Sequence, residues 1–141
     1  MSSNHELLDQ LFAVSLAVAE HTNRGLEERE LSRAQARLLW ALADHGPVTQ
    51  QQLSRLLQVT PRYVTRLVDG MEDQRLVARQ THPSDRRATI VRLLNSGVQL
   101  TEQMRTDHER LAEELFGSFS SSQRCTLLVT LRQLAEALSR T

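Results

Sequence analysis

The sequence predicts a mainly α-helical fold with one small β-hairpin, and three features lead to this prediction. Apolar residues recur at helical spacing through most of the 141 residues. The capping-box pattern that begins helices, Ser or Thr followed three residues later by Glu or Gln, occurs repeatedly. Strand-like runs occur within residues 76–93, where a polar stretch separates them.

The first helix is expected over residues 3–25. Ser3 and Glu6 form its capping box. Its apolar stripe consists of Leu7, Leu11, Val14 and Val18, widened by Leu8 and Phe12. Residues 24–30 are polar, so we expect them to connect this helix to the next one.

A second helix is expected to begin near Ser32, because Ser32 and Gln35 form another capping box. Its predicted buried positions are Leu38, Leu39, Leu42 and Ala43, with Trp40 beside them. Gly46 and Pro47 end this helix, since glycine adopts the left-handed conformation that follows a helix and proline cannot continue one.

Two short helices joined by a tight turn are expected next. Thr49 and Gln52 form the capping box of the first. Its inward-facing residues are predicted to be Leu53, Leu56 and Leu57. Only Gln58 and Val59 separate this helix from Thr60, the N-cap of the next one. The spacing predicts a helix-turn-helix, although any helix pair in a bundle gives the same spacing.

The second of these helices, residues 60–74, has two different faces. The buried face consists of Val64, Leu67, Val68 and Met71, which recur at i, i+3, i+4 and i+7. The other face presents Arg62, Tyr63, Arg66 and Asp69. Pro61 suits the first helical position, where no N–H is needed. A helix anchored along one face, with Arg and Tyr at its N-terminal end, can enter a DNA groove.

A β-hairpin is expected directly after this helix. Its strands are residues 76–81 and 88–93, and its tip contains a proline. A hairpin in this position forms a wing, whose Arg86 and Arg87 can reach a neighbouring minor groove. The alternative is a solvated loop in which an Asp85–Arg87 pair only stiffens the turn.

Two longer helices complete the chain. The first runs from Asn95 or Ser96 to about residue 116, and Gly117 ends it. A capping box at Ser120 begins the second. Its apolar positions are Leu127, Leu128, Leu131, Leu134 and Leu138. This helix has more apolar surface than a peripheral helix needs, so we expect it to form a homodimer interface with the first helix of the chain.

The positive charge is concentrated in the predicted helix-turn-helix and wing. All 17 basic residues are Arg, and the formal net charge of the chain is zero. Residues 49–92 nevertheless contain eight Arg and four acidic residues, a net charge of +4. This distribution favours double-stranded DNA as the partner, and an Arg-rich solvated surface is the alternative.

The remaining patterns argue against other classes of protein. The single cysteine, Cys125, allows neither an intrachain disulfide nor a cysteine-based zinc site. We expect it to be buried and inert at the dimer interface, and a peroxide-sensing thiol is the alternative. The histidines are scattered without metal-ligand spacing, and no catalytic motif is present, so no metal, cofactor or enzymatic activity is predicted. No secretion signal or membrane-spanning run is evident, which predicts a cytoplasmic protein.

These elements together resemble the MarR family of bacterial winged helix-turn-helix transcriptional regulators. The motifs that carry the resemblance are Val-Thr-Arg-Leu-Val-Asp (64–69), Leu-Val-x-Arg (76–79), Pro-x-Asp-Arg-Arg (83–87), Val-x-Leu (91–93) and Gly97. The resemblance implies a winged helix-turn-helix flanked by long N- and C-terminal dimerisation helices. It also implies a homodimer that binds a pseudo-palindromic operator and releases it when a small aromatic or phenolic effector binds.

The resemblance assigns roles to particular residues. The exposed part of the recognition helix and the wing would contribute the DNA-binding residues Thr60, Arg62, Tyr63, Thr65, Arg66, Asp85, Arg86 and Arg87. Thr49 joins them, because the helix that follows it can offer free N–H groups and a hydroxyl to a phosphate. An effector pocket between the first, second and fifth helices would be lined by His21, Arg37, Trp40 and His108, although Trp40 is equally suited to the core.

The sequence departs from the family pattern at three positions. Arg75 replaces a frequent glycine, Asn95 or Ser96 replaces the usual threonine cap, and Gly70 lies inside the recognition helix. None of these changes removes a predicted DNA-contacting side chain. We therefore predict a dimerisation region (1–30 and 96–141), a DNA-binding region (31–95) and the function of a repressor. The alternative is a protein-interaction module with the same fold that does not bind DNA.

Overall fold

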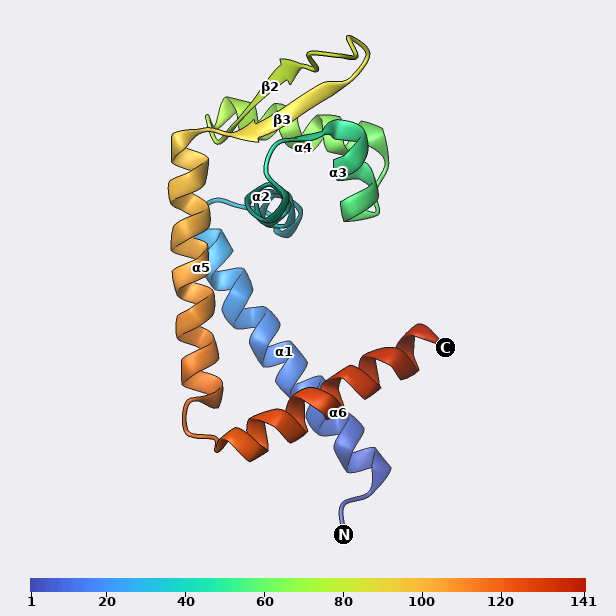
Figure 1. Ribbon diagram of the computed structural model, residues 1–141. Helices are drawn as coiled ribbons and strands as arrows, with labels where there is room; N and C mark the ends of the chain where they lie inside the picture. The colour runs from blue at the N-terminus through green and yellow to red at the C-terminus, as the bar shows by residue number, and fades with distance from the viewer. The chain divides into compact units, whose positions relative to one another are not determined.

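The computed structural model describes residues 1–141, and apart from one short additional strand its elements follow the predicted order. The elements are α1 (Asn4–Glu28), α2 (Arg33–His45), β1 (Val48–Thr49), α3 (Gln50–Leu57), α4 (Pro61–Asp73), β2 (Val77–Thr81), β3 (Thr89–Leu93), α5 (Asn95–Phe116) and α6 (Ser121–Ser139) (Figure 1). The mainly helical fold with a small hairpin wing is therefore confirmed. The chain forms two compact units, Met1–Thr101 and Glu102–Thr141. None of the helices is both long and apolar enough to cross a membrane.

The predicted capping boxes all form. In α1, α2, α3 and α6 the hydroxyl of the N-cap residue accepts a hydrogen bond from the backbone N–H of the residue three positions later. The side chain of that later residue in turn accepts a bond from the backbone N–H of the N-cap residue. The N-cap residues are Ser3, Ser32, Thr49 and Ser120. These bonds satisfy N–H groups that have no partner within the helix, which is why local sequence located these helix starts well.

The expected end of α1 is wrong. The helix continues to Glu28, through residues that we expected to connect it to α2. Gly25 is tolerated inside it, because a glycine weakens a helix by only about 1 kcal/mol relative to alanine. The chain turns where Glu30 adopts a left-handed φ of 56° and the N–H of Leu31 donates to the carbonyl of Leu26 at 2.9 Å.

The core of the first unit lies between α2, α3, α4 and the sheet. Its fully buried side chains are Leu38, Leu39, Leu53, Val64, Val68, Met71, Val77 and Val91. Three predicted core positions differ from expectation, since Leu56 is 43% exposed and Ala43 and Leu67 are only partly buried. On α3 the inward positions are Leu53 and Leu57, which are one helical turn apart.

The sheet has three antiparallel strands in the order β1–β3–β2. The central strand β3 pairs Val91 with Val48 of β1 on one side and with Arg79 of β2 on the other. The hairpin strands were predicted to within one residue, whereas β1 was not predicted. Two residues are too few to show the alternation that marks a strand, so pairing with β3 defines β1.

A tight junction joins the end of α4, the hairpin and the start of α5. Arg75 adopts a left-handed φ of 60°, although it lacks the freedom of glycine. Neither Asn95 nor Ser96 serves as the expected cap of α5. The hydroxyl of Ser96 donates to the carbonyl of Arg75, and Asn95 is already the first residue of the helix. Gly97 lies so close to the carbonyl of Leu76 that a Cβ atom there would collide with it.

The second unit contains the rest of α5 and α6. Gly117 ends α5 as predicted, and its N–H donates to the carbonyl of Glu113 at 2.8 Å. Phe116 and Phe119 pack edge to face in the following turn, with ring centroids 5.8 Å apart. None of the 19 residues of α6 is buried in the chain by itself.

Candidate nucleic-acid interface

One face of α4 anchors the helix to the core. Val64, Val68 and Met71 are fully buried on this face. At the N-terminus the hydroxyl of Thr60 accepts the N–H of Tyr63 at 3.1 Å, and Pro61 occupies the first turn. Because the buried residues extend over two turns, they fix the rotation of α4 about its axis.

The opposite face of α4 presents two unpaired cations. Arg62 and Arg66 are exposed, are one helical turn apart, and make no ion pair or hydrogen bond within the chain. The neighbouring Thr65 is also exposed, and its hydroxyl donates to the carbonyl of Pro61 at 3.1 Å. Two guanidinium groups on a fixed helix face can adopt the geometry of base edges or phosphates without first breaking internal contacts.

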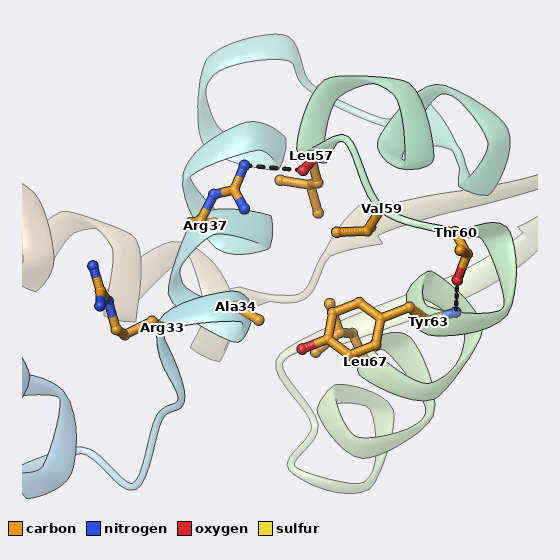
Figure 2. Close-up of a pocket in the computed structure, with 8 residues that line it drawn as sticks. All are labelled: Arg33, Ala34, Arg37, Leu57, Val59, Thr60, Tyr63 and Leu67. Carbon is orange, nitrogen blue, oxygen red and sulfur yellow. Dashed lines mark hydrogen bonds between the residues drawn. The ribbon is translucent and has the colours of Figure 1, made fainter. Parts of the chain in front are cut away.

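Tyr63 lies on the flank of α4 instead of at the centre of its exposed face. Its side chain is partly exposed and, with Leu67, faces α2. Figure 2 shows the ring extending from α4 toward Ala34. The structure therefore brings together Arg62, Thr65 and Arg66 and sets Tyr63 to one side of them.

An arginine that the sequence analysis did not select connects α4 to the rest of the site. Arg79 of β2 donates through Nη1 to Asp69 at 2.7 Å and Glu72 at 2.6 Å, both on α4. Its Nε donates to Gln50 of α3 at 2.7 Å, and its Nη2 donates to the carbonyl of Thr65 at 3.0 Å. A single side chain thus joins α3, α4 and the wing. The fork of five N–H donors that arginine carries suits such a position.

The wing tip carries the second pair of unpaired cations. Arg86 and Arg87 are exposed in the loop between β2 and β3, and their guanidinium groups have no partner within the chain. The carboxylate of Asp85 accepts the backbone N–H of Arg87 at 3.0 Å. Asp85 therefore stabilises the turn through the backbone, and the Arg87 guanidinium remains free.

Thr49 and Thr60 each cap a helix through the hydroxyl oxygen, and the hydroxyl hydrogen remains available as a donor. Thr49 accepts the N–H of Gln52 at 3.1 Å, as Thr60 does that of Tyr63. A hydroxyl that accepts one bond still has its own hydrogen to donate. Each threonine can therefore cap its helix and donate to a phosphate oxygen at the helix N-terminus.

A cavity of about 720 Å³ lies beside α4 (Figure 2). It is lined by Arg33, Ala34, Arg37, Leu57, Val59, Thr60, Tyr63 and Leu67. Arg37 donates to the carbonyl of Leu57 at 3.0 Å. Of the residues predicted to line an effector pocket, only Arg37 lines this cavity. His21 lies on α1 and Trp40 on α2 outside its lining, and His108 belongs to the second unit.

The other candidate groups form no site. Cys125 is exposed on α6, so the fold of the single chain does not provide its expected burial. No group of three or more His, Cys, Asp or Glu side chains is placed to hold a metal ion.

Comparison with known proteins shows similarity to one group of regulators. A profile of the MarR family matches residues 30–88. The HTH-type transcriptional repressor NicR of Pseudomonas putida is 31% identical over 108 residues, covering 77% of this chain and 68% of that protein. A MepR mutant from S. aureus has a TM-score of 0.80 at 21% identity, covering 97% of this chain and 99% of that one. FabT from Streptococcus pneumoniae, solved in complex with DNA, has a TM-score of 0.79 at 22% identity, covering 96% of this chain and 95% of that one.

Proposed function

The chain belongs to the MarR family of transcriptional regulators, and we propose that it binds double-stranded DNA as a homodimer at a pseudo-palindromic operator. Members of this family are regulators and not enzymes. We assign residues 31–95 to DNA binding, and residues 1–30 with 96–141 to dimerisation. Because the protein would act on chromosomal DNA, we assign it to the cytoplasm.

The observation that carries the proposal is the fixed exposed face of α4. Arg62 and Arg66 project from a helix whose opposite face is fully buried, so they can enter the major groove as one rigid surface. An arginine that bonds the O6 and N7 atoms of guanine discriminates against other bases by roughly 1–3 kcal/mol. We assign base recognition mainly to Arg62 and Arg66, with Thr65 beside them.

The wing contributes affinity in this proposal. The side chains of Arg86 and Arg87 are free of internal partners and can neutralise phosphates or enter a narrow minor groove. Thr49 and Thr60 add helix N-termini that can bind phosphate through N–H groups and a hydroxyl. These contacts depend little on sequence and depend strongly on salt.

The apolar surfaces of the terminal helices support the homodimer. No residue of the 25-residue α1 is buried in the single chain, and five of its large apolar side chains are exposed. These side chains are Leu7, Leu8, Phe12, Val14 and Leu16. The exposed apolar residues of α6 are Leu128, Val129, Leu131, Leu134 and Leu138. A second copy that covers these faces removes them from water and provides the two-fold symmetry of a pseudo-palindrome.

We further propose that the protein is a repressor released by a small aromatic or phenolic effector. The relative NicR is named as a repressor, which supports the first part. The cavity beside α4 supports the second, because its apolar lining lies next to the guanidinium groups of Arg33 and Arg37. A molecule bound there would contact Tyr63 and Leu67 on the helix that enters the groove.

A binding titration tests the proposal. Fluorescence anisotropy with a labelled duplex from upstream of its own gene is expected to give saturable binding, with affinity that falls steeply as salt rises. A scrambled duplex of the same length is the control for specificity. Absence of binding to any genomic fragment, even at low salt, would instead support the alternative, a protein-interaction module with this fold.

A further inference from the structure

The wing tip is closed by an unusual side-chain acceptor. Nδ1 of the His82 imidazole accepts the backbone N–H of Ser84 at 3.0 Å and that of Asp85 at 3.2 Å. An aspartate or asparagine often caps a turn in this way, and here an imidazole does so. Because both partners are donors, Nδ1 carries no proton, and the neutral ring holds its hydrogen on Nε2.

The other bonds of the tip complete the same loop. The N–H of His82 donates to the carbonyl of Ala88 at 3.1 Å, and the N–H of Ala88 donates to the carbonyl of Asp85 at 3.0 Å. The Asp85 carboxylate accepts the N–H of Arg87. The backbone that carries Arg86 and Arg87 is thus held by His82 on one side and Asp85 on the other, while both guanidinium groups remain free.

We propose that His82 is a positioning residue for the wing: its neutral imidazole holds the tip so that Arg86 and Arg87 point to DNA together. This inference rests on the proposed DNA-binding function. The ring acts through the backbone and does not itself contact DNA. Loss of the acceptor leaves the two exposed N–H groups bonded only to water and lets the tip move, so the arginines must then be ordered when DNA binds.

Protonation of the ring removes the acceptor. In the imidazolium form both ring nitrogens are donors, so neither N–H bond can form. The charged groups of the tip are Asp85, Arg86 and Arg87, and no charged side chain from another element bonds to the ring. The two N–H bonds therefore require a ring whose Nδ1 is unprotonated.

A set of variants tests the proposal through DNA affinity. His82→Ala should weaken binding about three- to tenfold, the effect expected from one or two ordinary hydrogen bonds. His82→Asn, which keeps an acceptor for the same turn, should bind within about twofold of the natural protein. In the Arg86→Ala, Arg87→Ala background, adding His82→Ala should change affinity little, because the residue acts through those arginines.

Two results would overturn the proposal. If His82→Asn binds as weakly as His82→Ala, the imidazole contacts DNA directly. If His82→Ala has the same effect with and without Arg86 and Arg87, it does not act through them. Failure of the natural protein to bind any DNA would instead refute the proposed function.

A measurement on the free protein tests the positioning role without DNA. The ¹⁵N spectrum of His82 should show the Nε2–H tautomer at neutral pH. The amide signals of Ser84 and Asp85 should shift in His82→Ala, which lacks the acceptor, relative to the natural protein. A ring protonated at Nδ1 at neutral pH would contradict the proposal.

Discussion

The recognition helix and the wing tip present similar pairs of arginines, but they are held in different ways. The orientation of α4 is set by fully buried Val64, Val68 and Met71 and by the Arg79 network, which spans three elements. The tip is held only by bonds between residues within the loop itself. Under the proposed function, this difference favours specificity from α4, where small errors of position matter, and affinity from the wing, where phosphates tolerate them.

The largest expected effect comes from removing the guanidinium of Arg79. Arg79→Met keeps most of the side-chain length but removes the guanidinium donor to Asp69, Glu72 and the Thr65 carbonyl, while the backbone N–H of residue 79 still donates to Glu72. The free energy of unfolding should fall by roughly 1.5–3 kcal/mol, the range for hydrogen bonds to charged groups. Denaturant titration measures this decrease, and base discrimination should decline with it.

Arg92→Met is the matched control for that experiment. Arg92 lies on the neighbouring strand and makes one bond, from Nε to the Gln80 side chain at 3.2 Å. Its replacement should change stability by less than about 1 kcal/mol, because exposed polar pairs contribute little. Equal destabilisation by both variants would show that Arg79 does not fix α4.

The second effect concerns base discrimination by α4. Arg62→Ala should relax the preference at one base pair per half-site by roughly 1–3 kcal/mol. Affinity for a panel of single-substituted operators measures this change, and the fold should be unaffected because the Arg62 side chain has no internal bonds. If base preference is unchanged at every operator position, another residue must recognise the bases, and Arg66 is the next candidate.

A smaller effect, different in kind, is expected from the wing. Arg86→Ala or Arg87→Ala should weaken binding to all sequences alike. The slope of log affinity against log salt should become shallower by about 0.9 for each phosphate that the variant no longer neutralises. A change of base preference in these variants would place the wing among the determinants of specificity and contradict the division of roles between the wing and α4.

The smallest expected effect tests whether α4 is as stable as it could be. A Cβ added at Gly70 would meet only the Gln35 side-chain nitrogen, at an ordinary 3.7 Å. Gly70→Ala should therefore stabilise the protein by up to about 1 kcal/mol through helix propensity. Thermal unfolding measures the increase, and DNA affinity should not change.

Features set by neighbouring residues were predictable from the sequence, and those set by distant residues were not. The capping boxes and the hairpin depend on residues a few positions apart, so these elements were located to within a few residues. The strand β1 exists only because β3 pairs with it, and the exposure of Leu56, which was expected to face inward with Leu57, depends on how α3 packs.

The same distinction applies to the site. The exposed arginines of α4 and the wing were predictable, since periodicity and turn chemistry identify them. The Arg79 network joins residues from positions 50 to 79 on three elements, which no local pattern reveals. Arg79 and Asp69 each occurred in a motif of the family resemblance, but their spacing provided no reason to pair them.

The close approach of Gly97 to Leu76 has an evolutionary consequence. The obstacle to a side chain at position 97 is the carbonyl oxygen of Leu76, which belongs to the backbone and cannot change by mutation. No compensating substitution elsewhere removes that obstacle, whereas position 70 is open to alanine. In a library randomised at both positions and selected for folding, only glycine should survive at 97, while 70 should accept several residues.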